Sequence, residues 1–144
     1  NKINVIVSVG NDGCINCWSM DKPNPSEWKV SSLDVCRHGS ESSSATKKIT
    51  SSCIVHEEVH RAVIAVGTSC GKVSLVEIIK SEGNNLRVSF LKDRTIIGLK
   101  EGGEANVIHA LCSKKHEKFC RLIIGHRSGL SVWNMDMAPR ITVK

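Results

Sequence analysis

Three segments of the 144-residue chain repeat one pattern, and this repetition constrains the fold more than any other feature of the sequence. Each segment has an apolar run, a glycine, a short polar stretch, a second glycine and a second apolar run. The segments are residues 8–21, 65–78 and 123–136, and their second glycines, Gly13, Gly71 and Gly129, lie at intervals of 58 residues. Glycine readily adopts the positive φ that tight hairpin turns require. The repeat therefore predicts three antiparallel β-hairpins.

Short runs rich in β-branched residues occupy much of the remaining chain. Runs of about 4–8 such residues, bounded by glycine, serine, asparagine or charge, are typical of strands. We expect strands at residues 3–9, 62–66, 72–79, 86–91, 121–124 and 130–133. Residues 113–118 tolerate a helical turn but are too few to form a convincing helix. The sequence thus predicts an all-β fold.

The three repeated units resemble WD repeats, which form the blades of β-propeller proteins. The family pattern is an apolar strand, a turn ending in Asp-Gly or Ser-Gly, and an apolar strand ending in Trp-Asp. Asp12-Gly13 with Trp18 matches this pattern in the first unit, and Ser128-Gly129 with Trp133 matches it in the third. In the middle unit Val76 stands at the tryptophan position after Gly71, and the third unit is one residue shorter between its glycine and its tryptophan. The resemblance assigns a structural role in the repeat to Gly13, Trp18, Gly71, Gly129 and Trp133.

The resemblance implies a partial β-propeller of about three four-stranded antiparallel blades. Residues 1–35 correspond to an incomplete first blade, and residues 49–91 and 107–144 correspond to the next two. The resemblance implies strands at 49–55, 61–67, 72–79 and 86–91 in the second blade and at 107–112, 119–125, 130–133 and 140–143 in the third. The 58-residue interval exceeds the family's usual period of about 40–45 residues, so residues 36–48 and 92–106 are expected to be interblade loops. Propellers typically close with about four to eight blades. We therefore expect the whole chain, residues 1–144, to be part of a larger propeller.

The function implied by this architecture is protein binding without catalysis. Propellers display variable loops on rigid strands, and such loops carry function. The sequence has no Gly-x-Ser-x-Gly elbow and no phosphate-binding glycine-rich loop. We interpret the chain as a scaffold or adaptor that binds other proteins of a multi-subunit complex, with no cofactor, metal or catalytic residue predicted.

Cysteine usage and hydropathy give expectations about location. The seven cysteines are odd in number, irregularly spaced and mostly inside apolar runs, which favours a reducing compartment, the cytoplasm or the nucleus. No apolar run reaches the roughly 18–20 residues of a membrane helix, so no membrane insertion is expected. The serine-rich residues 40–44 are expected to lie in a surface loop, where phosphorylation stays an open alternative.

A basic stretch carries the alternative function. The chain has a net charge of +6, and its densest cationic stretch contains Lys114, Lys115, Lys118, Arg121 and Arg127. Such a patch can neutralise phosphates, which makes RNA the alternative partner. A solvated hairpin that keeps a sheet edge soluble is the competing interpretation.

Two residue pairs resemble metal ligands. Cys14 and Cys17 are three residues apart, but in an extended strand this spacing places side chains on opposite faces, and a structural zinc site needs four ligands. His56 and His60 are four residues apart, a spacing that suits one metal only on a helix. We favour a buried core position for the cysteines and a charged hairpin turn for the histidines.

Overall fold

The computed structural model describes residues 3–36, 48–83, 85–91, 96–97, 105–112, 119–127 and 129–136. In these residues it has strands and one short 3-10 helix, so the predicted all-β fold is confirmed. The elements are β1 (Val5–Val9), β2 (Cys14–Ser19), η1 (Pro25–Glu27), β3 (Val30–Asp34), β4 (Ile49–Glu57), β5 (Arg61–Thr68), β6 (Lys72–Ser81), β7 (Asn85–Phe90), β8 (Ile96–Ile97), β9 (Ala105–Cys112), β10 (Phe119–His126) and β11 (Gly129–Asp136). The expected strand at 140–143, the helical turn at 113–118 and the serine-rich residues 40–44 lie outside the described residues.

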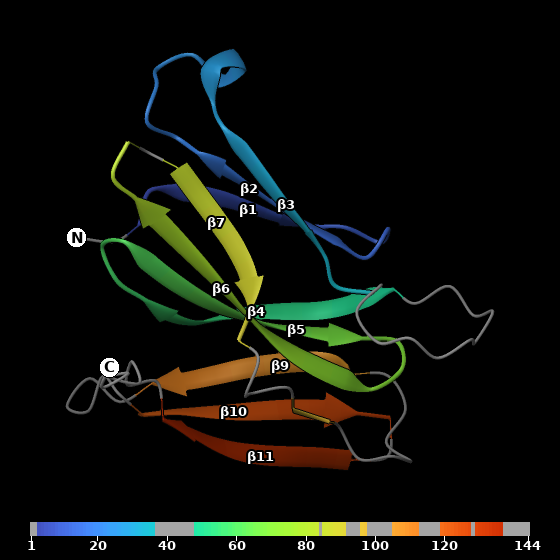
Figure 1. Ribbon diagram of the computed structural model, residues 1–144. Helices are drawn as coiled ribbons and strands as arrows, with labels where there is room; N and C mark the ends of the chain where they lie inside the picture. The colour runs from blue at the N-terminus through green and yellow to red at the C-terminus, as the bar shows by residue number, and fades with distance from the viewer. Residues whose placement is uncertain are drawn as a thin grey trace, which may run out of the picture.

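The strands form three antiparallel sheets (Figure 1). Sheet 1 has the order β1-β2-β3, sheet 2 has the order β4-β5-β6-β7, and sheet 3 has the order β11-β10-β9. Sheet 2 lies between the other two. The described strands form no closed barrel or closed ring of sheets. Among the described residues, sheet 2 has four consecutive strands, and sheets 1 and 3 have three each.

One short strand lies within the segment expected to be an interblade loop. In residues 92–106, β8 pairs with the start of β6, with Lys72 opposite Ile97 and Val73 opposite Ile96. The edge of β6 is covered by β7 only from Val76 onward, so β8 supplies backbone partners for its first residues. Two isoleucines suit this position because β-branched residues favour extended backbone.

The three glycines of the repeat lie at the hairpin ends: Gly13 and Gly71 occupy equivalent turns, and Gly129 is the first residue of β11, where it pairs with His126. Gly13, Gly71 and Gly129 have φ values of 83°, 82° and 152°, and the turns lie on the same side of the three sheets (Figure 1). The amide of Gly13 donates to the carbonyl of Gly10 at 3.1 Å, and the amide of Gly71 donates to that of Thr68 at 3.0 Å. The prediction of three hairpins is confirmed.

The third hairpin is one residue shorter than the other two, and the difference lies in its turn. The strand pairs closest to the first two turns are Val9 with Ile15 and Gly67 with Val73. In the third hairpin Gly125 pairs with Leu130, and His126 pairs with Gly129. The strands themselves keep their regular pairing, so equivalent side chains keep the same face of each sheet.

Two apolar cores hold the sheets together. We call the face of a sheet that looks toward the next sheet in chain order its forward face, and the opposite one its rear face. The forward face of sheet 1 packs on the rear face of sheet 2 through Ile15, Cys17, Ile64, Val66, Val76 and Ile78, among others. The forward face of sheet 2 packs on the rear face of sheet 3 through Val55, Val63, Ala65, Val73, Leu75, Leu122 and Ile124. Strand β5 is therefore buried on both faces, which explains its continuous apolar sequence.

Candidate interaction surface

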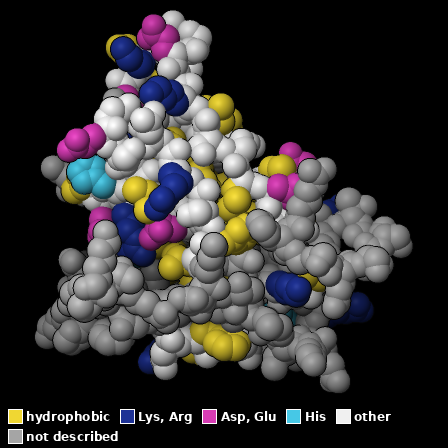
Figure 2. All heavy atoms as spheres, in the orientation of Figure 1, with side chains coloured by type: hydrophobic (Ala, Val, Ile, Leu, Met, Phe, Trp, Pro, Cys, Tyr) yellow, Lys and Arg dark blue, Asp and Glu magenta, His cyan; other side chains and the backbone are white. Residues whose placement is uncertain are grey.

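Among the described residues, the longest run of exposed residues lies in the connection between β2 and β3, residues 20–29, which we call the 20–29 loop. Its residues 22–27 are exposed, and it forms the projecting end of the molecule, with charged side chains on its surface (Figure 2). Asn24 caps η1, since its side-chain oxygen accepts from the amide of Ser26 at 3.2 Å. Pro25 occupies the start of η1, where its fixed φ suits a helix and its missing amide costs nothing.

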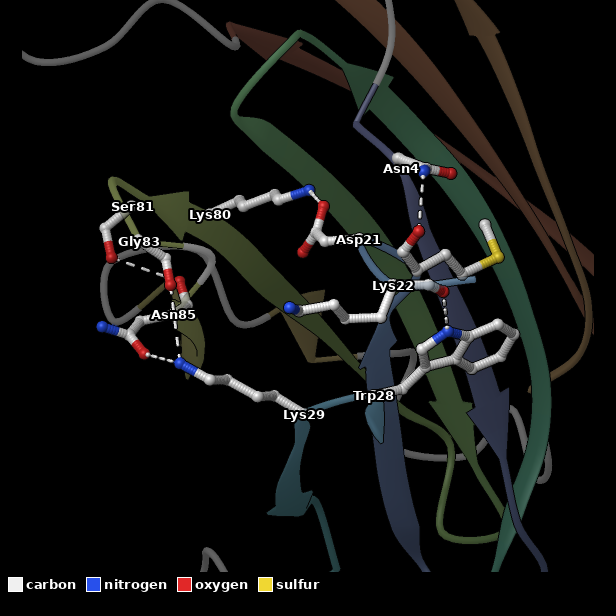
Figure 3. Close-up of polar contacts among 10 residues, drawn as sticks. Asn4, Asp21, Lys22, Trp28, Lys29, Lys80, Ser81, Gly83 and Asn85 are labelled. Atoms are coloured by element: carbon white, nitrogen blue, oxygen red, sulfur yellow. Dashed lines mark hydrogen bonds and ion pairs between the residues drawn. The ribbon is translucent and has the colours of Figure 1, made fainter. Parts of the chain in front are cut away.

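A hydrogen bond from Trp28 restrains the 20–29 loop internally. The indole Nε1 of Trp28 donates to the carbonyl of Lys22 at 2.7 Å (Figure 3). This contact joins the two ends of the exposed stretch. The loop therefore has a defined shape although most of its side chains face solvent.

Two lysine contacts attach the loop to sheet 2 (Figure 3). Asp21, two residues after the end of β2, forms an ion pair with Lys80 of β6, and both side chains are largely buried. Lys29, at the other end of the loop, donates from Nζ to the side-chain oxygen of Asn85 at 2.9 Å and lies 3.5 Å from the carbonyl of Gly83. The second carboxylate oxygen of Asp21 is buried and has no hydrogen-bond partner among the described residues.

This arrangement can bind a protein surface through polar contacts. The loop presents Lys22, Asn24, Ser26 and Glu27 to solvent, and these residues supply hydrogen-bond donors, acceptors and charges of both signs. A pre-ordered loop binds with a smaller loss of conformational entropy than a flexible one. Sequence reasoning missed this surface, although the Asn-Pro-Ser-Glu stretch is a helix-start signal that could have indicated it.

The predicted basic patch is represented in the described residues by two arginines. Arg121 is exposed, and its Nε donates to the side-chain oxygen of Asn134 at 3.2 Å. Arg127 is exposed in the turn between β10 and β11. The two lie near opposite ends of β10, about 20 Å apart at the usual rise of a strand. Lys114, Lys115 and Lys118 lie outside the described residues.

The residues at the tryptophan position of the repeat share one orientation. Trp18 lies opposite Ile6, Val76 opposite Ile64, and Trp133 opposite Leu122. Ile64, Val76 and Leu122 belong to rear faces, and Trp18 alternates with the forward-facing Ile15 and Cys17 along β2. All three positions therefore point to the rear of their sheets.

Three side chains, His126, Ser131 and Trp133, are linked by hydrogen bonds on the rear face of sheet 3. The Ser131 hydroxyl oxygen lies 3.2 Å from Nε2 of His126 and accepts from the indole nitrogen of Trp133, also at 3.2 Å. The other ring nitrogen of His126 is buried and has no hydrogen-bond partner among the described residues. These hydrogen bonds connect the end of β10 near the turn with two side chains of β11.

The candidate metal pairs are separated by the strand geometry. Cys17 is fully buried in the core between sheets 1 and 2, whereas Cys14 is half-buried on the opposite face of β2. Burial raises the pKa of the Cys17 thiol to about 11, so it is protonated at neutral pH and is neither a thiolate ligand nor a ready nucleophile.

His56 and His60 do not share a helix face. His56 lies in β4, where its Nε2 is 2.7 Å from the Glu58 carboxylate, and His60 lies in the turn before β5. Among the side chains that the structure describes, no group of three or more His, Cys, Asp or Glu residues is placed to hold a metal ion.

Comparison with known proteins gives no match: no protein-family model, no curated protein and no solved structure matches the chain. No helix in the described part of the chain has the length and apolar character needed to cross a membrane.

Proposed function

We propose that the chain is a three-blade segment of a WD-repeat-like β-propeller and acts as a non-catalytic scaffold for other proteins inside the cell, in the cytoplasm or the nucleus. The single observation that carries the binding role is the 20–29 loop, which is exposed yet fixed to sheet 2 at both ends. The stacking of three sheets, each with a hairpin that reverses near Gly13, Gly71 or Gly129, supports the propeller assignment.

The proposal separates the roles of body and loop. The stacked sheets supply rigidity through two apolar cores, and the loop supplies the partner-specific contacts. Function in such scaffolds depends on displayed loops rather than on the fold itself. Lys22, Asn24 and Glu27 are the side chains that we expect a protein partner to contact, because all three are exposed on the ordered loop.

The test is affinity purification from cell extract with quantitative mass spectrometry, using the wild-type chain and the triple variant Lys22→Ser, Asn24→Ser, Glu27→Ser. A matched control changes the exposed turn residues Asn11, His60 and Glu82 to alanine. We expect the loop variant to lose at least tenfold of its specific partners while the control retains them. Equal partner recovery by both variants, with the loop variant folded, would contradict the proposal.

The alternative partner, RNA, is distinguished by salt. Phosphate binding weakens steeply as ionic strength rises. RNA binding measured at two ionic strengths, with and without Arg121→Ala and Arg127→Ala, separates the two functions. Binding at low salt that depends on these arginines would favour the RNA alternative.

A further inference from the structure

The forward face of sheet 3 is uncovered within the described residues and presents two exposed apolar side chains beside the exposed polar pair of Arg121 and Asn134. Leu130 and Val132 of β11 point to this face, since they alternate with Ser131 and Trp133, which lie opposite the core residues Ile124 and Leu122. Leu130 is 72% exposed and Val132 is 59% exposed. Exposed apolar clusters of this kind are typical of surfaces that another protein element covers.

The same positions are buried in the two preceding sheets. Val132 lies opposite Ile123, as Cys17 lies opposite Val7 and Leu75 lies opposite Ala65. Likewise Leu130 lies opposite Gly125, as Ile15 lies opposite Val9 and Val73 lies opposite Gly67. The four equivalent residues of sheets 1 and 2, Ile15, Cys17, Val73 and Leu75, are at most 1% exposed because the next sheet covers them. At these two positions the forward face of sheet 3 is thus built like two faces that each receive a sheet, whereas Arg121 stands where Val5 and Val63 stand in sheets 1 and 2.

The opposite end of the stack has the matching face. On the rear of sheet 1, Ile6, Trp18 and Val30 form one cross-strand row, with Ile6 41% exposed and Val30 58% exposed. The equivalents of Ile6 in the other sheets are Ile64 and Leu122, which are buried against the preceding sheet.

The polar positions of the rear faces also recur. Asn16 lies opposite Ser8, just as Ser74 lies opposite Val66 and Ser131 lies opposite Ile124. The rear faces of sheets 2 and 3 both have a polar residue at this position, and each covers the forward face of the preceding sheet. The rear of sheet 1 therefore has the composition of a covering face and has no covered partner among the described residues.

We propose that the forward face of sheet 3 binds the rear face of sheet 1 of a second copy of this chain. Two copies joined in this way form a closed head-to-tail dimer of six stacked sheets, which lies within the range of about four to eight blades in closed propellers. Both ends then repeat an interface that the chain already uses, whereas a contact between two identical end faces repeats none. This inference rests on the blade-like stacking in the proposed function and is independent of partner binding by the 20–29 loop.

The experiment is analytical ultracentrifugation of the chain at micromolar concentration. We expect a species of twice the 15.7 kDa monomer mass. Val132→Lys and Ile6→Lys each place a charge on one end face, and each should weaken the dimer at least tenfold. Val59→Lys is the matched control, because Val59 is 46% exposed in the turn after β4 and lies on neither end face.

Mixing the two variants identifies the orientation. In a head-to-tail dimer of one Val132→Lys copy and one Ile6→Lys copy, both charges fall in one interface and the other interface is wild type. The mixture should therefore dimerise more tightly than either variant alone. A monomeric wild-type chain with intact β circular dichroism, a dimer insensitive to Ile6→Lys, or open-ended polymers would each overturn the proposal. Loss of partners without loss of the dimer would count only against the proposed function.

Discussion

Asp21 and Lys80 are 59 residues apart in the sequence, and their ion pair joins the end of β2 in sheet 1 to β6 in sheet 2. Both side chains are largely buried, so the two charges depend on each other. Lys80→Met leaves the Asp21 carboxylate without its partner and should reduce the free energy of unfolding by about 3 kcal/mol. Urea denaturation measures this loss.

The double variant Asp21→Asn, Lys80→Met tests whether the two residues act as a pair. It removes both charges and should recover at least about 1 kcal/mol of the loss expected from adding the single effects. Lys29→Met is the control, because Lys29 is exposed and its contact with Asn85 should contribute less than about 1 kcal/mol. Additive single effects would show that the pair is not coupled.

The turn glycine Gly13 should tolerate alanine poorly. Its φ is 83°, and an added Cβ would lie 2.7 Å from the Cβ of Cys36. Gly13→Ala should lower stability by about 1–3 kcal/mol from the backbone conformation, with a further loss from the contact. Gly83→Ala is the matched comparison, since Gly83 has a φ of 77° but an added Cβ meets nothing closer than 4.0 Å. Thermal unfolding should rank Gly13→Ala as the more damaging change.

The core between sheets 2 and 3 should depend on Leu122, which is fully buried. Leu122→Ala should cost about 2–5 kcal/mol, because it removes apolar contacts and leaves a cavity. Ile54→Ala, at an exposed position of β4, should change stability by no more than about 0.5 kcal/mol. Equal effects of the two changes in chemical denaturation would argue against sheet 3 packing on sheet 2.

The buried thiol of Cys17 gives stability a dependence on alkaline pH. Its pKa is raised from 9.0 to about 11 in the folded chain, so the unfolded chain loses this proton first as pH rises. The contribution is complete below pH 9 and is lost between pH 9 and about 11, at a rate of up to about 1.4 kcal/mol per pH unit. Cys17→Ala should remove this slope, which denaturation curves at pH 8, 9 and 10 will show.

The indole contact of Trp28 should keep the 20–29 loop ordered. Trp28→Phe removes the donor to the Lys22 carbonyl and should speed amide hydrogen exchange in residues 22–29 without a comparable change in the sheets. Trp18→Phe, which alters the rear face of sheet 1, is the control and should leave exchange in the loop unchanged. Exchange in the loop that stays at the wild-type rate in Trp28→Phe would show that other contacts fix it.

The hairpins and strands are predictable from the sequence because their signals are local. A glycine in a short polar stretch between two β-branched runs predicts a hairpin turn, and the structure shows the positive φ of such a turn at Gly13 and Gly71. Cys17 is likewise predictable as a core position, because alternation along a strand separates it from Cys14. Strand β8 is not predictable in this way, since two isoleucines are too few to show a period.

The candidate interaction surface could not be predicted from local sequence patterns. The pair of Asp21 with Lys80 and the contact of Lys29 with Asn85 bring together residues more than fifty positions apart, and no spacing rule connects them. They become neighbours only because sheet 1 stacks on sheet 2. The WD-repeat resemblance, the partner class and the cellular location stay predictions.

The shortened third hairpin has a consequence for how this chain should be compared with others. Its missing residue lies between His126 and Gly129, where pairing shows a tighter turn than in the first two hairpins. An alignment that matches the repeats glycine to glycine would pair inward with outward positions along β11. The gap belongs at the loop tip, where a change in hairpin length leaves the pattern of faces along both strands unchanged.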